Sequence, residues 1–454
     1  MSLLKSSKID ATQGNLLHGI ILYAIPLILS TLIQTCFNAI DLIVVGNMAN
    51  AEAVASVGAT TSITSLVVSS FVGIASGAKI ILARQFGARD SDRIQKTSDT
   101  VVLTALGLGA LIALLGVPFA PQLLPLTNCP PECFDGADIY TRIYIAAAPA
   151  ILLYNFGSAI ITSSGDSRRP MLYILVSGLV NVILNIILCL ILEQKVAAVA
   201  IATAASQLVA AGLVLYRLCH IKGDGHINLF KMRFHPHSFK RIMQQGIPLA
   251  LSTALYPLAN LQIQSAVNSF GYSATAGNAA GAQIEGFVGC INSSMSATVT
   301  VFMGQNIGAH KRDRVMRAFW TCLILGITAE AVIGSSIYLS GRFWLSLFLP
   351  KDPVAIEYGM IRMLYVILFH AIACVNGVLS HAIQTYGYST YSAFASICCI
   401  FGFRMIWMWF VYPQFQTFHM LMACFLVSWT LLMFFNIVGV IVFRRRFEKH
   451  HPIL

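Results

Sequence analysis

The chain has 454 residues, of which 57% are hydrophobic and only 10% are charged, and its formal net charge is +11. A soluble domain carries roughly 25% charged residues, so this chain has too few charges to cover a surface that faces water. Lipid must therefore be its outer solvent. Because cytoplasmic loops of membrane proteins collect Lys and Arg, the positive charge needs no nucleic-acid partner to explain it.

Taken in chain order, the apolar stretches predict about twelve membrane-spanning helices, each of about 20 residues. They are centred near residues 31, 67, 107, 150, 182, 206, 253, 288, 329, 370, 401 and 430. Lys and Arg gather in alternate connections, including those at 84–96, 217–241 and 311–317. This alternation places both termini in the cytoplasm. The expected class is an all-α integral membrane protein of two pseudo-symmetric six-helix bundles.

One phrase occurs twice, because ARQFGARD at 83–90 returns as GQNIGAHK at 304–311. The Ile-Pro-Leu at 25–27 also recurs 222 residues later, at 247–249. Gly165 corresponds to Gly387 at the same shift. These repeats indicate an internal duplication, and each copy of the phrase is expected to cap the cytoplasmic end of the second span in its half.

The duplication predicts three parts: an N-terminal lobe at 15–217, a cytoplasmic linker at 218–240 and a C-terminal lobe at 241–443. Each lobe holds an even number of spans, so both begin on the same side of the membrane. A two-fold axis along the membrane normal is therefore expected, as in parallel-repeat transporters. Two such lobes could rock between inward-open and outward-open states.

The residues resemble those of the multidrug and toxic compound extrusion (MATE) transporters, and in particular a bacterial branch similar to DinF. The resemblance rests on the duplicated AR-x-x-GA and GQN-x-GA ends, the SSGDSRRPM turn, and the NVILN and AIATAASQ stretches, and it covers nearly the whole chain. It implies a protein of the bacterial cytoplasmic membrane that exports organic cations or other amphipathic compounds, driven by inward flow of Na⁺ or H⁺.

Asp41 is the residue expected to bind the coupling ion. It follows Asn38 in the outer half of the first span, not at the midplane. A charge at mid-membrane costs roughly 2.5–3.5 kcal/mol, so any charge inside a span needs a reason. From the residues alone, Asp41 is either a carboxylate that takes up H⁺ or Na⁺, or an interfacial helix end. The resemblance implies that Asn181, Asn185 and Thr203 are its partners. Asn185 stands where the family has a second carboxylate, which favours H⁺; Asp41 would be a metal ligand if Na⁺ is the coupling ion.

Pro26 lies inside the first span and leaves the carbonyl of Leu22 without its helical donor. A bend is expected there, either as a hinge that responds to Asp41 or as a fixed kink. In the second half, His370 could titrate near neutral pH, but a packing role is expected.

The second half also offers intramembrane charges. Glu285 is expected either on a cavity wall, where it would pair with cationic compounds, or in a structural ion pair. Arg404 is the one clear cation that we find inside a span of this half, and it is expected to pair with Glu285 or Glu330, or to contact substrate. Because acidic residues outnumber Arg404, cationic cargo is favoured. The expected substrate-binding residues are Gln34, Asn38, Gln283, Glu285 and Arg404.

The predicted function is secondary active antiport by a monomer that needs no cofactor and is not an enzyme. The sequence contains no GxxxxGK[ST] phosphate loop and no HExxH motif, so direct use of ATP and metal-dependent catalysis are not expected. Two alternatives stay open, namely a flippase for lipid-linked saccharides of the same superfamily and a static channel or receptor. Whether Cys129 and Cys133 form a disulfide is also open, with unpaired thiols favoured.

Overall fold

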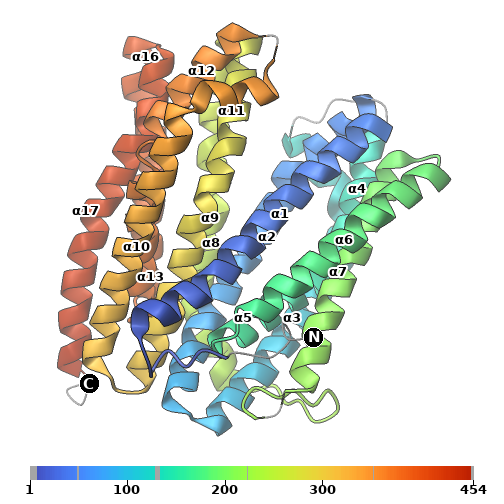
Figure 1. Cartoon of the computed structure of the whole chain (residues 1–454). Helices are drawn as coiled ribbons and strands as arrows, with labels where there is room; N and C mark the ends of the chain where they lie inside the picture. The colour runs from blue at the N-terminus through green and yellow to red at the C-terminus, as the bar shows by residue number, and fades with distance from the viewer. Residues whose placement is uncertain (1–7, 49–50, 128–132, 222, 351, 451–454) are drawn as a thin grey trace. The chain divides into compact units, whose positions relative to one another are not determined.

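The computed structural model describes residues 8–48, 51–127, 133–221, 223–350 and 352–450, which fold almost entirely into helices (Figure 1). Within these ranges no β-strand occurs, which confirms the all-α class. For some helical residues only the backbone is described, among them Asn38 and Asp41. Cys133 is a free, buried thiol, and Cys129 lies outside the described residues.

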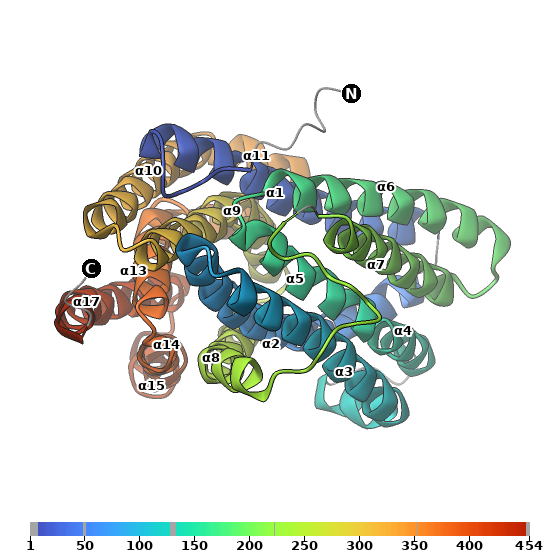
Figure 2. The ribbon, with the colours of Figure 1, turned by 90° about the horizontal axis from the view of Figure 1, so that it is seen from below.

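The chain divides into two compact units, and unit 1 comprises the residues up to Asp10 together with Ile25–Ala250. In this unit α6 and α7 run side by side (Figures 1 and 2). Pro149 cannot donate a backbone hydrogen bond, and it lies in the first turn of α5, where the pair α4 and α5 bends by 46°. The helices of unit 1 are α1 (Leu16–Met48, from Ile25 on), α2 (Ala51–Ala88), α3 (Ser91–Leu123), the short 3₁₀ turn η2 (Leu124–Thr127), α4 (Phe134–Ala146), α5 (Ala148–Ser163), α6 (Arg168–Ile191) and α7 (Lys195–Cys219).

Unit 2 comprises Ala11–Ala24 and the residues from Leu251 on. A second broken span occurs here, because α12 and α13 are bent by 42° across Val366–Phe369. The helices of unit 2 are α8 (Pro236–Asn268, from Leu251 on), α9 (Tyr272–Gly308), α10 (Arg312–Leu339), α11 (Gly341–Phe348), α12 (Pro353–Tyr365), α13 (His370–Thr385), α14 (Ser389–Ser396), the π-helical η4 (Ile397–Gly402), α15 (Phe403–Ile406), the π-helical η5 (Trp407–Val411), α16 (Tyr412–Phe415) and α17 (Phe418–His450).

Among the described residues, nine helical stretches are long and apolar enough to cross a membrane, and the two bent pairs raise this number to eleven. Eleven of the predicted spans therefore have a counterpart. The span predicted near residue 253 coincides with α8, which is 33 residues long but is not among these apolar stretches. The count of twelve and the cytoplasmic placement of the termini stay predictions.

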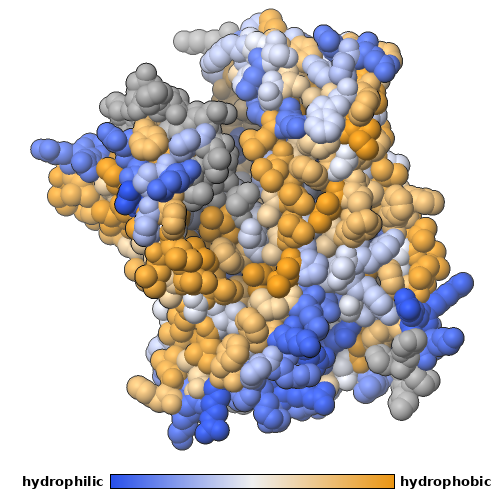
Figure 3. Space-filling view, turned by 180° about the vertical axis from the view of Figure 1, so that it is seen from behind, coloured by the Kyte–Doolittle hydropathy of each residue, from blue (hydrophilic) through white to orange (hydrophobic). Residues whose placement is uncertain are grey.

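Large apolar side chains are exposed along the helices, as a lipid-facing surface requires. Leu114, Leu190 and Leu208 expose 73%, 71% and 63% of their surface. Figure 3 shows hydrophobic residues over much of the visible face, with strongly hydrophilic residues gathered mainly toward the top and bottom of the view. In water these side chains would favour aggregation, whereas in a bilayer they contact acyl chains.

The repeated phrase ends a helix in the same way in both units. After α2, the Asp90 N–H donates to the Gln85 carbonyl and Arg89 has a φ of +53°. After α9, the Lys311 N–H donates to the Asn306 carbonyl and His310 has a φ of +55°. This bonding around one left-handed residue is a Schellman cap. The prediction that the phrase caps a helix is therefore confirmed. The turns at Gly165 and Gly387 likewise have matching positive φ values of 96° and 94°.

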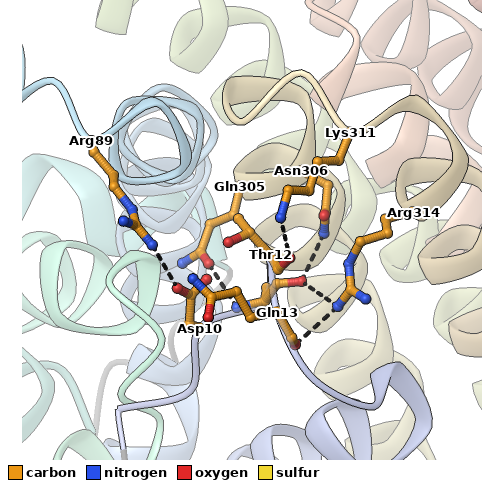
Figure 4. A network of polar contacts seen from close by, with 9 residues as sticks. Asp10, Thr12, Gln13, Arg89, Gln305, Asn306, Lys311 and Arg314 are labelled. Carbon is orange, nitrogen blue, oxygen red and sulfur yellow. Dashed lines mark hydrogen bonds and ion pairs between the residues drawn. The ribbon is translucent and has the colours of Figure 1, made fainter.

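The residues before α1 are held by side chains from the two copies of the phrase and by Arg314, which follows the second copy (Figure 4). Within unit 1, Arg89 forms an ion pair with Asp10 at 3.2 Å. Within unit 2, Ala11–Gly14 accept hydrogen bonds through their carbonyls from Asn306 (3.0 Å), Lys311 (2.8 Å) and Arg314 (3.0–3.1 Å). Gln305 completes this set, because its Oε1 accepts from the Ala11 N–H at 3.1 Å.

The first turns of α1 and α8 belong to different units from the rest of these helices. Ile20, Tyr23 and Ala24 of α1 are buried in unit 2, where Tyr23 contacts Phe302 edge-on. The first half of α8, up to Ala250, packs in unit 1, where a Cβ on Gly77 would lie 2.6 Å from the Gly246 backbone nitrogen. Both helices change unit at or just after an Ile-Pro-Leu. The predicted lobe boundaries stay a prediction.

Candidate functional site

Two of the predicted coupling residues meet inside unit 1. Asn181 and Asn185 are both buried on α6, and the Asn185 Nδ2 donates to the Asn181 Oδ1 at 3.2 Å. One turn earlier, the Ser177 hydroxyl donates to the Ser206 carbonyl of α7 at 2.6 Å. Buried polar groups inside a span require such partners, because lipid offers none. The two asparagines therefore form a polar patch on one face of α6.

The remaining predicted coupling residues are not brought into this patch by a described contact. The Thr203 hydroxyl donates to the carbonyl of Val199 in its own helix, α7, at 3.0 Å. The side chains of Asp41 and Asn38 lie outside the described residues, although their backbone is part of α1. Gln34, also in α1, is exposed.

A close approach between α1 and α6 occurs beside the asparagines. A Cβ built on Gly178 would lie 1.8 Å from Cε2 of Phe37, so only glycine leaves room for that ring. Phe37 and position 41 are one helical turn apart and share a face of α1, and Gly178 shares a face of α6 with Asn181 and Asn185. Pro26 is buried within α1, one residue after the point where the helix passes from unit 2 to unit 1.

In unit 2, Glu285 lies in an ion pair with Arg362 of α12. Arg362 also donates to the Asn278 Oδ1 at 2.6 Å, and Asn278 donates onward to the Gln264 Oε1 at 2.9 Å. The structural ion pair that the sequence left open for Glu285 is thus present. Gln283, by contrast, is exposed on α9.

Arg404 is not the partner of a carboxylate, which corrects one expectation. Its side chain is fully buried between the two π-helical stretches, and its Nε and Nη1 donate to the Ser428 hydroxyl (3.1 Å) and to Asn260 Oδ1 (2.9 Å). The guanidinium also lies 4.4 Å from the centre of the Phe425 ring and 5.6 Å from that of Tyr256. Among the described residues it has no ionic partner, and its Nη2 makes no hydrogen bond to them.

Glu330 pairs with His370 instead, with 2.9 Å between the Glu330 Oε2 and the imidazole Nδ1. Both side chains are buried. One expectation is therefore wrong: Arg404 is not the only cation within the spans of the second half, since Arg362 lies in the broken span. His370 is buried, as its expected packing role requires, and it also makes a specific polar contact.

Sequence reasoning missed Arg362 and the contact of His370 because both flank the break between α12 and α13. The segment Pro353–Tyr365 carries Glu357 and Arg362, so its composition resembles a loop as much as a span. The sequence nevertheless contained a signal for the ion pair of Arg362. An arginine next to a long apolar stretch lies inside the membrane only when it has a polar or charged partner.

Two bundles of apolar helices, each with buried polar networks inside its spans and each ending its second helix with the same cap, define an integral membrane protein with an internal repeat. The family model described as MatE matches residues 26–187 and 248–410, which is more than half of the chain, and the chain belongs to this family. The matched stretches begin at Pro26 and Pro248, which are the two prolines of the Ile-Pro-Leu repeats. The resemblance to MATE transporters is confirmed.

The chain is 25% identical over 390 residues to the probable multidrug resistance protein YoeA of Bacillus subtilis (strain 168), covering 84% of each chain. It is 25% identical over 317 residues to an FAD transporter of Shewanella oneidensis, covering 68% of this chain and 69% of that protein. A transporter of the MOP superfamily from Pyrococcus furiosus superposes with a TM-score of 0.87 at 21% identity, covering 98% of each chain, and so shares the fold.

Proposed function

We propose that the protein is a secondary active exporter of organic cations or other amphipathic compounds, driven by H⁺ or Na⁺ flowing inward across the bacterial cytoplasmic membrane. The family match and the multidrug resistance relative support export of small molecules. The buried polar patch on α6 is the observation that carries the coupling part of the proposal. A static channel could not do uphill work, so accumulation against a gradient separates the two functions.

In this proposal Asp41 binds the coupling ion next to Asn181 and Asn185, with Thr203 nearby. The contact of Phe37 with Gly178 supports this, because it brings the face of α1 that carries position 41 against the face of α6 that carries the asparagines. Asn181 and Asn185 offer neutral oxygens, so a single carboxylate would hold Na⁺ weakly, and H⁺ is the favoured ion. Pro26 is proposed as the hinge through which the bound ion changes the bend of α1.

We expect Asp41→Asn to abolish gradient-driven export while leaving the protein folded, because the amide cannot exchange a proton. Export of a fluorescent organic cation is measured in proteoliposomes, with the Na⁺ and pH gradients imposed separately. Asp135→Asn, at an exposed acid in the first turn of α4, is the matched control and keeps full activity. Undiminished uphill export by Asp41→Asn would end the assignment of this residue.

A second cargo class is favoured by Arg404. Because Glu285 and Glu330 are already bonded to Arg362 and His370, the excess of acids that favoured cationic cargo disappears in unit 2. Arg404 is left as a buried cation held by neutral groups, and such a cation attracts negative charge. Anionic cargo, such as a flavin nucleotide or a lipid-linked phosphate, is the second candidate.

Competition decides between the two cargo classes. If the cargo is anionic, FAD inhibits export of a labelled substrate, and Arg404→Gln removes this inhibition while Arg404→Lys preserves part of it. If the cargo is cationic, FAD has no effect on native protein and ethidium competes instead. The readout is export from proteoliposomes at matched protein content.

A further inference from the structure

We propose that Glu330 and His370 form a second proton-binding site, located inside unit 2. The carboxylate Oε2 and the imidazole Nδ1 are 2.9 Å apart, and the two side chains are 0% and 6% exposed. Glu330 lies in the middle of α10 and His370 is the first residue of α13. A carboxylate and an imidazole joined by one hydrogen bond can together hold one or two protons, and their titration belongs to the pair.

The Glu330–His370 pair lies at the break in a span, so a change in its protonation can alter the bend between α12 and α13. His370 follows directly after Val366–Phe369, where α12 and α13 bend by 42°. On α10, a Cβ on Gly334 would lie 2.8 Å from the Ile367 carbonyl oxygen, so this helix already packs closely on the break. The Glu330–His370 bond therefore ties α10 to the broken span at its bend, and a second proton weakens this tie by neutralising the carboxylate.

The second imidazole nitrogen faces a part of α9 that lacks bulky side chains. The His370 Cε1 and Nε2 lie 3.9 and 4.0 Å from where a Cβ on Gly289 would be. Along the same face of α9, Gly286 and Ser293 are exposed, and a Cβ on Gly286 would meet no atom within 4 Å. The side chains on this face, next to the exposed Gln283, are small or polar. Water can therefore reach the His370 Nε2, whereas a leucine or phenylalanine here would block it.

Several other titratable or charged groups face the pair. Glu285 on α9 interacts electrostatically with His370, but its carboxylate is already in an ion pair with Arg362 of α12. Cys374 on α13 and Cys322 on α10 are buried thiols nearby. From α17 the Trp429 indole meets the imidazole edge-on, with 5.7 Å between ring centres. Glu330 and His370 are thus the carboxylate and the imidazole in direct hydrogen-bond contact here, and the titration follows the protons that they share.

Trp429 supplies a direct optical test, because a protonated imidazole in contact with an indole quenches its fluorescence. Trp320, Trp344, Trp407 and Trp409 are replaced by Phe, and the fluorescence of Trp429 is followed from about pH 5 to 9 in purified full-length protein. We expect one sigmoidal step. His370→Gln removes the step and Glu330→Gln displaces its midpoint, whereas His381→Gln, at a histidine hydrogen-bonded to Thr300, leaves it unchanged.

A flat curve, or a step that persists in His370→Gln, would overturn the proposal. If the tryptophan replacements unfold the protein, proton uptake over the same range is measured by potentiometry on native protein and His370→Gln, and equal uptake overturns the proposal as well. The role of this site in coupling rests on the proposed export function, but the titration needs no gradient and no cargo. It can therefore fail while export through Asp41 stands, and it can succeed even if Asp41→Asn still exports.

Discussion

The contact between Phe37 and Gly178 shows how one missing side chain positions two helices. Glycine is a poor residue inside a helix by about 1 kcal/mol relative to alanine, so its presence in α6 needs a reason. The reason is the aromatic ring that occupies the space of its Cβ. The polar patch on α6 therefore depends on packing as much as on its polar residues.

We expect Gly178→Ala to lower the thermal stability of the protein and to impair export, because the added methyl group overlaps the Phe37 ring. Overpacking of this kind costs about 1–3 kcal/mol. The measurement is the unfolding temperature in detergent, together with export in proteoliposomes. Gly212→Ala in α7 is the matched control, since a Cβ there meets nothing within 4 Å, and it should keep or raise the stability. Equal behaviour of the two variants would contradict the packing argument.

The start of α12 shows how one side chain can fix where a helix begins. Asp352 is the cap of α12: its Oδ1 accepts from the Ala355 N–H at 2.9 Å, and its Oδ2 accepts from the Ser273 hydroxyl of α9 at 2.7 Å. Both bonds favour the charged carboxylate and hold the pKa of Asp352 below its usual value, the backbone bond from Ala355 having the larger effect. One residue thus starts α12 and ties it to the beginning of α9.

Because the pKa of Asp352 is lowered on folding, its charge stabilises the folded state at neutral pH, and this contribution is lost as the pH falls through the lowered pKa. We expect Asp352→Ala to lower the unfolding temperature at pH 7, with a smaller effect in acid. Asp352→Asn can still cap the helix and should lose less stability, while the acid dependence disappears. Unfolding is followed by circular dichroism, and the same loss in both variants would argue against the cap.

On the scale of the whole molecule, each unit contains a segment from the other half of the sequence. Ala11–Ala24 packs in unit 2, and the first half of α8 packs in unit 1. A duplication by itself predicts two self-contained lobes, so this exchange was not expected. Each lobe, cut at the linker, would expose the apolar surface that normally receives the exchanged segment.

We expect fragments 1–224 and 225–454 to co-purify when they are expressed together and to aggregate when they are expressed alone. The apolar contacts of Ile20 and Tyr23 with unit 2, and of Ile242 with unit 1, supply the attraction. Removing residues up to Ala24 from the first fragment should weaken the association. Pull-down from detergent extracts measures it. Two fragments that are each stable alone, with no affinity for one another, would contradict the exchange.

The lipid environment, the helical class, the duplication and the family could all be predicted from the sequence, because these depend on composition and on repeated local patterns. A Schellman cap or an apolar span is formed by residues that are consecutive in the chain. The helix ends at Gly-Ala-Arg (87–89) and Gly-Ala-His (308–310) could therefore be predicted from the sequence. The asparagine pair on α6 could also be predicted, since two residues four apart share a helix face.

Which charged side chains pair with one another could be seen only in the folded chain. Glu285 and Arg362 are 77 positions apart, Glu330 and His370 are 40 apart, and Arg404 reaches Asn260 across 144 positions. No local pattern relates such residues, because their pairing depends on which helices are neighbours and how each is rotated about its axis. For the same reason the exchange of the first turns of α1 and α8 appeared only in the folded chain, where each apolar helix face had found the surface that buries it.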